Sequence, residues 1–182
     1  MNKRSAFTIT ETLACVCIIA VLAGLLFPVY SSVRRRDAQS LVSNNLHSIG
    51  LAIAMYRADD GGDAIYGDMY AMGLPPTLNQ LRAYGVPAKI QFGPQGEQEG
   101  WRAAGHVMYL PPDQEANQPY KWSDYVRKNQ EATVTWASVG FTDPGVPMRS
   151  PFSTYRGLGV RLDTSVLQRV RAGDYGSYTW WE

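Results

Sequence analysis

The stretch Phe7–Tyr30 reads FTITETLACVCIIAVLAGLLFPVY, and its only charged residue is Glu11. As an α-helix this stretch would be about 36 Å long, which is enough to cross the roughly 30 Å hydrocarbon core of a bilayer. It therefore predicts a transmembrane helix over residues 7–30. Lys3 and Arg4 precede it and favour a cytoplasmic N-terminus, whereas three arginines at 34–36 weaken that bias. With this orientation, the rest of the chain lies outside the cytoplasmic membrane.

Three simpler interpretations of this segment compete. A secretory signal has an apolar core of about 7–15 residues and then a small-residue cleavage site, but this run is longer and carries a carboxylate near its start. A lipoprotein signal would use Cys15, but the sequence FTITE before it is too polar for an apolar core. A plain membrane anchor gives no reason for Glu11, because a carboxylate at the centre of a membrane helix costs roughly 2.5–3.5 kcal/mol on insertion scales.

The string Ser5–Glu11, SAFTITE, followed by the apolar run, resembles the N-terminus of type IV pilins and type II secretion pseudopilins. In that class a membrane-embedded prepilin peptidase removes a short basic leader just before a Phe, and the new N-terminal amine is then methylated. A Glu is the fifth residue after the cut, as Glu11 is when counted from Phe7. The residue before the cut is usually Gly and here is Ala6, so we expect slower cleavage between Ala6 and Phe7.

The resemblance implies a cytoplasmic leader at residues 1–6, a methylated N-terminus at Phe7 and a role in assembly for Glu11. After cleavage the amine of Phe7 would be a cation, and its pairing with Glu11 in low dielectric would couple assembly to processing. The implied partners are other copies of the chain, the prepilin peptidase, an inner-membrane assembly platform and membrane lipid. Gly24 and Pro28 predict a kink, because proline removes one backbone hydrogen bond of the helix.

Residues 31–60 read as an amphipathic continuation of the same helix. Apolar residues recur every three or four positions and form one stripe; they are Val42, Leu46, Ile49, Ile53 and Tyr56. The sequence Asp59–Gly62, DDGG, is a typical C-terminal signal. We therefore expect one helix of about 50 residues, whose second half packs against a globular head.

The region 25–59 also resembles a bacterial pilin-like subfamily, through Asn45-Leu46, Ile49-Gly50-Leu51 and Met55-Tyr56. Members often carry one cysteine near the position of Leu41 or Val42 and another in a later Phe-x-Cys-Pro. Neither cysteine is present in this chain, and Phe92-Gly93-Pro94 falls at the later position. The disulfide of that subfamily is therefore not expected. The N-terminal resemblance covers roughly a third of the chain.

Residues 61–182 form the predicted extracytoplasmic head, and ten of the eleven prolines lie there, so long helices are not expected. Residues 88–130 look rich in loops. The expected short elements are a helix from Pro76 or Thr77 to Tyr84, strands at His106–Leu110, Ala132–Val139, Gly157–Leu162 and Ser177–Trp181, and a helical turn at Ser165–Val170. The predicted fold class is α+β and pilin-like, with one long N-terminal helix, its first half transmembrane, packed on a small antiparallel sheet.

The head carries few motifs of chemical use. It has no Gly-rich phosphate loop, no His-x-x-x-His pair and no Gly-x-Ser-x-Gly, so we expect no enzymatic activity and no cofactor. His47 and His106 are expected to have surface or packing roles. Four aspartates around a glycine turn could hold Ca²⁺, but their spacing does not match a known calcium loop and favours a solvated turn; they are Asp59, Asp60, Asp63 and Asp68.

The head is rich in aromatic residues. Its five tryptophans are Trp101, Trp122, Trp136, Trp180 and Trp181, and the chain has eleven tyrosines. Buried packing or contacts between neighbouring subunits explain them best. Two weaker alternatives concern the C-terminal pair: adhesion to sugars or surfaces through Trp180-Trp181, and an edge strand at 177–181 that a neighbour would cover.

These patterns predict a structural subunit that is cleaved, N-methylated and polymerised into a type IV pilus or a secretion pseudopilus. Its precursor would be a single-pass protein of the inner membrane, and the product a periplasmic or cell-surface filament. The alternative is an uncleaved, signal-anchored binding protein with an extracytoplasmic head. A formal net charge of +1 gives no signal for nucleic-acid binding. The sequence does not distinguish pilus from pseudopilus, or a major from a minor subunit.

Overall fold

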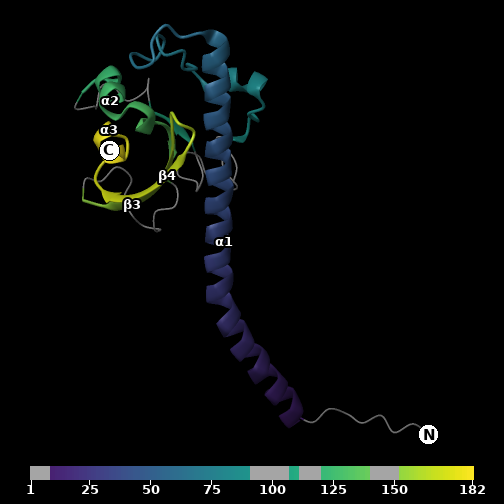
Figure 1. Cartoon of the computed structure of the whole chain (residues 1–182). Helices are drawn as coiled ribbons and strands as arrows, with labels where there is room; N and C mark the ends of the chain where they lie inside the picture. Colours follow the sequence, from purple (N-terminus) through teal and green to yellow (C-terminus); the bar gives the residue numbers. More distant parts are fainter. Residues whose placement is uncertain (1–8, 91–106, 111–119, 140–151) are drawn as a thin grey trace. The chain divides into compact units, whose positions relative to one another are not determined.

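The computed structural model describes residues 9–90, 107–110, 120–139 and 152–182 (Figure 1). The chain divides into two compact units, Met1–Asp37 and Ala38–Glu182, which are described separately below. Helix α1, Ile9–Asp60, is 52 residues long and supplies residues to both units. The prediction of one long helix is therefore confirmed, and the fold class is α+β.

The first unit consists, among the described residues, of the N-terminal part of α1. Glu11 lies in its first turn, where a carboxylate is favourable because of the positive end of the helix dipole. No residue of Ile9–Phe27 is buried within the structure. A helix suits such a segment in an apolar solvent, because all backbone hydrogen bonds are then made within the segment itself.

In the second unit, residues 38–60 of α1 bury the predicted apolar stripe. Val42, Leu46 and Ile49 are fully buried and Ile53 is 3% exposed, which confirms the stripe, while Tyr56 is half-buried. Gly61 follows the helix with φ +63°, a left-handed conformation that glycine adopts without strain. Its N–H donates a hydrogen bond to the carbonyl of Arg57 at 3.2 Å, so the helix ends where the DDGG signal predicts.

The sheet has four antiparallel strands in the order β1-β2-β3-β4. Their bounds are Met108–Tyr109 for β1, Val134–Ser138 for β2, Thr154–Arg161 for β3 and Val166–Ala172 for β4. Strands were expected at 132–139 and 157–162, and β2 and β3 confirm them; β1 confirms part of the segment expected at 106–110. A bulge lies between Val134 and Trp136, which changes the face to which the following side chains of β2 point.

The second half of α1 packs directly on one face of this sheet. A Cβ atom at Gly50 would lie 2.7 Å from Cγ2 of Val160, so only glycine permits this close approach of helix and strand. The Nδ1 atom of His47 is 3.0 Å from the carbonyl oxygen of Thr164, in the turn between β3 and β4. These contacts confirm that the helix packs on the sheet within the head.

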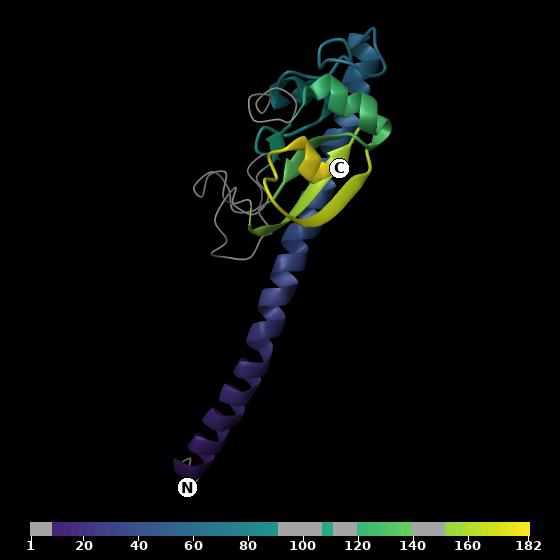
Figure 2. The ribbon, with the colours of Figure 1, turned by 90° about the vertical axis from the view of Figure 1, so that its left-hand side faces the viewer.

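Short helices cover the other face of the sheet. They are α2, Trp122–Asn129, and α3, Tyr178–Trp181, and Figure 2 looks onto the sheet with α3 in front and α1 behind. The rings of Tyr125 and Tyr178 stack with centroids 4.8 Å apart and join the two helices. A 3-10 helix, Leu78–Tyr84, confirms the short helix expected there, and Gly85 ends it at φ +85°.

Three local predictions in the head are wrong. Helix α2 lies in the region expected to be loop-rich, because Trp122, Tyr125 and Val126 bury one face at helical spacing. The helical turn expected at Ser165–Val170 is instead part of β4, which pairs with β3 along its whole length. The strand expected at Ser177–Trp181 is instead the helix α3.

Candidate functional site

The apolar part of α1 is the most unusual surface of the molecule. The large apolar side chains between Leu13 and Phe27 are 53–75% exposed. Ile9–Phe27 has a mean hydropathy of 2.3 and is the one helix among the described residues that is long and apolar enough to cross a membrane. Length and composition alone define this property, and a signal sequence has the same profile. No described residue buries the segment, and an exposed apolar surface of this size is typical of a site of contact with a membrane or another protein.

Of the predicted cleavage and assembly residues, the structure describes Glu11. Glu11 is exposed in the first turn of α1, near the N-terminal end of the apolar stretch. Ala6 and Phe7 lie outside the described residues, as does the rest of the predicted leader. The cut between Ala6 and Phe7, and the pairing of Phe7 with Glu11, stay predictions.

The predicted kink concerns two residues further along α1. The backbone is helical through both Gly24 and Pro28. A Cβ atom at Gly24 would meet no atom of the described residues within 4 Å, so none of them requires a glycine at this position. The kink itself stays a prediction.

The aspartate turn after α1 has a structural explanation for two of its four carboxylates. Asp59 Oδ2 accepts a hydrogen bond from the Tyr84 hydroxyl at 3.0 Å, which also raises the pKa of Tyr84. Asp68 Oδ1 accepts hydrogen bonds from the backbone N–H groups of Tyr70 and Ala71, at 2.9 and 3.0 Å. In the part of the chain that the structure describes, no group of three or more His, Cys, Asp or Glu side chains is placed to hold a metal ion.

A cavity of about 320 Å³ lies beside this turn, between the end of α1 and the following loop. Its wall includes Arg57. The Nε atom of Arg57 donates a hydrogen bond to the carbonyl of Met72 at 3.1 Å, and its Nη2 atom donates one to the carbonyl of Ile65 at 3.4 Å. The guanidinium group therefore closes the loop onto the helix. The remaining lining is mainly alanine and glycine, with Ile65, Met72 and the carboxylate residue Asp63.

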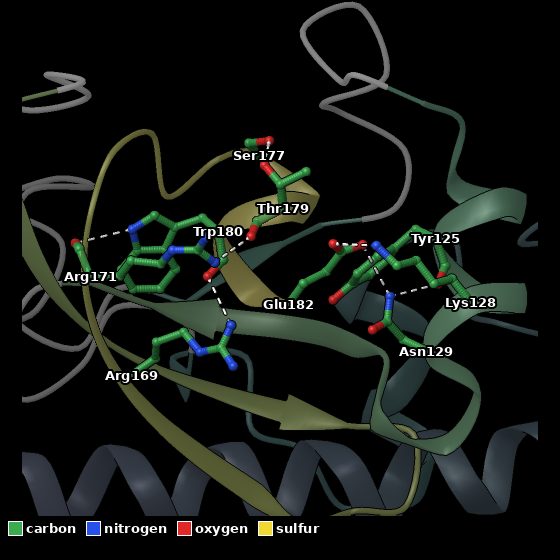
Figure 3. Close-up of polar contacts among 9 residues, drawn as sticks. All are labelled: Tyr125, Lys128, Asn129, Arg169, Arg171, Ser177, Thr179, Trp180 and Glu182. Atoms are coloured by element: carbon green, nitrogen blue, oxygen red, sulfur yellow. Dashed lines mark hydrogen bonds and ion pairs between the residues drawn. The ribbon is translucent and has the colours of Figure 1, made fainter.

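The C-terminal tryptophan pair is buried. Trp180 and Trp181 are 3% and 2% exposed, so the idea of adhesion through exposed Trp180-Trp181 side chains is wrong. Their indoles lie over two glycines of β3: a Cβ at Gly157 would be 2.8 Å from Trp181, and one at Gly159 would be 3.0 Å from the same ring. Figure 3 shows the N–H of Trp180 directed at the carbonyl of Arg171, with a distance of 3.2 Å.

Charged side chains surround this C-terminal segment (Figure 3). Arg169 Nη1 donates a hydrogen bond to the carbonyl of Trp180 at 3.2 Å, and Arg171 Nη1 donates one to Thr179 at 2.7 Å. On the opposite side, Lys128 Nζ is 2.8 Å from the Glu182 carboxylate. Burial and the neighbouring Arg171 lower the pKa of Arg169, because a second cation beside it is unfavourable.

A buried tyrosine links α2 to the sheet. The hydroxyl oxygen of Tyr125 accepts a hydrogen bond from the N–H of Val134 at 3.2 Å. Burial raises the pKa of Tyr125 to about 12. Burial also raises the pKa of Tyr109, which stacks on Trp136 with ring centroids 4.4 Å apart. Both tyrosines act as neutral core residues of the head.

The structure brings together side chains that the sequence does not connect. Arg169 and Arg171 point to the same face of β4 as neighbours two positions apart, and both contact α3. The alternation in Val166–Ala172, VLQRVRA, is the signal that predicts such a strand. Phe92-Gly93-Pro94, Trp101 and His106, by contrast, lie outside the described residues. No family model matches this chain, and neither does any curated protein or solved structure.

Proposed function

We propose that this chain is a structural subunit, cleaved and N-methylated by a prepilin peptidase, that polymerises into a type IV pilus or a secretion pseudopilus. The observation that carries the proposal is the contrast along α1. The helix exposes an apolar segment at Ile9–Phe27, and its last part is the central helix of a folded head. A bilayer can accept the apolar segment first, and a bundle of identical helices can accept it after assembly.

The proposed assembly step depends on the charge of the Glu11 carboxylate. The helix dipole favours a carboxylate in the first turn, but a carboxylate that enters a low dielectric is costly unless a cation is paired with it. A cut before Phe7 would create a cationic amine four residues from Glu11, and the attraction between the two charges is strong in a low dielectric. The pairing would satisfy both charges when the helix leaves lipid, so that only processed chains assemble. The precursor would then be an inner-membrane protein with its head outside the cytoplasm.

The first experiment is the mass of the N-terminal peptide from chains produced with and without a prepilin peptidase. The expected peptide with the peptidase starts at Phe7 and is heavier by one methyl group. Without the peptidase, the peptide should keep residues 1–6. A peptide that retains Met1 to Ala6 in both cases would contradict the proposal and favour an uncleaved, signal-anchored binding protein.

The second experiment tests the role of Glu11. We expect Glu11→Ala to leave membrane integration intact and to abolish filament assembly, because the amine of Phe7 would remain unpaired. Asp37→Ala is the matched control, since Asp37 is an exposed carboxylate on the same helix outside the apolar segment. Sheared filament yield is the measurement, and normal filaments from Glu11→Ala chains would refute the pairing.

A further inference from the structure

Three arginines form a cationic strip on the face of the sheet that carries α3. Arg161 is on β3, Arg169 and Arg171 are on β4, and we call these residues the arginine strip. In the pairing of β3 with β4, Arg169 lies opposite Gly157 and Arg171 lies opposite Tyr155. Because Arg169 and Arg171 are two positions apart on one strand, their side chains point to the same face of the sheet. No carboxylate among the described residues lies within ion-pair distance of any of the three.

The backbone carbonyls of α3 satisfy only a small part of the hydrogen-bonding capacity of the strip. Arg169 and Arg171 each donate one hydrogen bond, to Trp180 and Thr179. A guanidinium group has five N–H donors, and its planar fork suits a carboxylate. Arg171 is exposed, so its remaining donors are accessible to a partner. The strip is therefore suited to an anionic partner.

The turn after α1 has the opposite charge. Asp60 and Asp63 are exposed, and within the described residues neither carboxylate makes a hydrogen bond or an ion pair. Asp59 and Asp68, by contrast, have the structural partners described above. Two carboxylates of this turn are thus available for a contact outside the chain.

The strip and the turn cannot neutralise each other within one chain. Gln39 on α1 donates a hydrogen bond to Gln168 of β4 at 2.9 Å, so the neighbouring Arg169 and Arg171, the two arginines of the strip on β4, lie near the level of the start of the head's part of α1. Asp60 lies 60 − 39 = 21 residues further along the same helix, or about 30 Å at 1.5 Å per residue. The Debye length is roughly 8 Å at physiological ionic strength, so the two patches act independently.

Two complementary patches at different places on one chain define a head-to-tail contact. Such a contact leaves one free patch of each kind at the two ends, so it propagates into a ring or a helical polymer and does not stop at a dimer. We propose that the arginine strip of one copy binds the Asp60–Asp63 turn of a second copy. This inference rests on the proposed function and assigns a contact between heads in the polymer.

The test uses charge reversal in the full chain, expressed with its assembly machinery. We expect Asp60→Arg with Asp63→Arg to lower the yield of sheared filaments at least about tenfold, because like charges would then meet at the interface. Arg169→Asp with Arg171→Asp should have a similar effect. The chain that carries all four reversals should recover most of the yield. Asp124→Arg, at an exposed acid of α2, is the control and should assemble like the unaltered chain.

The arginine variant also loses hydrogen bonds to α3, so its fold is checked by tryptophan fluorescence. The aspartate variant removes no hydrogen bond within the described part of the head, so it is the decisive test. Normal assembly of Asp60→Arg/Asp63→Arg chains would overturn the inference. Failure of the fourfold reversal to restore assembly, in a chain with native fluorescence, would overturn it too. In either case, processed chains that form filaments dependent on Glu11 would leave the proposed function standing.

Discussion

The two units of the molecule differ in how far their apolar side chains are buried. In the head, residues 38–60 of α1 and the sheet bury each other's apolar side chains, and α2 and α3 cover the other face of the sheet. In the first unit, residues that are equally apolar remain exposed: Leu22 is 53% exposed, whereas Leu46 on the same helix is fully buried. The described part of the head buries a core of its own. The apolar segment is not buried by any described residue, and this difference is the basis of the proposed function.

The largest expected effect is a loss of stability of the head. Trp181→Ala should lower its free energy of unfolding by about 3–5 kcal/mol, because a buried indole leaves a cavity and Trp181 Nε1 loses its hydrogen bond to the carbonyl of Tyr175. Tyr70→Ala, at a side chain that is 73% exposed, should change it by less than about 0.5 kcal/mol. Denaturant unfolding of the full chain in detergent, followed by tryptophan fluorescence, measures both. Equal effects would mean that α3 is not part of the core.

A second prediction applies the same substitution to both units. Leu22→Arg should make insertion of α1 into a membrane less favourable by roughly 2.5–3.5 kcal/mol, since a guanidinium group would lie near the bilayer centre. Met55→Arg is the matched control, because Met55 is on the same helix and 48% exposed. The fraction of chain that resists alkaline extraction from membranes is the measurement. If both variants behave alike, the apolar segment is not the membrane anchor.

A third prediction compares a glycine replacement in the head with one in the apolar segment. Gly157→Ala should destabilise the head by about 1–3 kcal/mol, because its Cβ would lie 2.8 Å from Trp181 and 3.0 Å from Trp180. Gly24→Ala meets no atom within the chain, and alanine favours a helix by about 1 kcal/mol. We therefore expect Gly24→Ala to leave the isolated subunit intact. A loss of filaments from Gly24→Ala chains would indicate that another copy packs against this glycine.

The sequence predicts the long elements well because their patterns are long. The stripe that begins at Val42 repeats over four turns and can only be one face of a helix, and α1 follows it. The strand β2 begins with the β-branched Val134 and Thr135 and the aromatic Trp136, residue types that favour strands, and all five of its residues are buried. For α1 and β2, the local preference and the tertiary environment point to the same structure.

The short elements near the C-terminus could not be predicted, because contacts distant in sequence decide them. The segment Tyr178–Trp181, YTWW, has the composition of a strand, but the two glycines of β3 provide the space into which its indoles pack. The arginine strip likewise depends on the register of β3 and β4. Glu11 can be singled out from the sequence because it is the one charged residue of the apolar run 7–30. The strip cannot be, because pairing of two strands creates it.

A fourth prediction concerns alkaline pH and the buried tyrosine of the head. The folded-state pKa of Tyr125, about 12, is above its ordinary value of 10, so the stability that its neutral form contributes is complete below pH 10 and is lost as pH rises towards 12. Tyr125→Phe should cost about 1–3 kcal/mol at neutral pH, because the N–H of Val134 loses its acceptor. It should also flatten the fall of stability between pH 10 and 12. Unfolding curves over this range test the difference, and an unchanged slope would mean that Tyr125 ionises without opening the head.

The smallest expected effect concerns the ion pair at the C-terminus. Lys128 is 63% exposed at its side chain, so its 2.8 Å contact with Glu182 should stabilise the head by no more than about 1 kcal/mol. Salt should reduce that contribution further. Lys128→Ala, compared with Lys121→Ala on the exposed start of α2, isolates the ion pair in unfolding measurements at low and high salt. A loss as large as that of Trp181→Ala would contradict the view that packed indoles, rather than surface charge, hold α3 to the sheet. A small, salt-sensitive loss would leave the charges of the head free to serve contacts between copies.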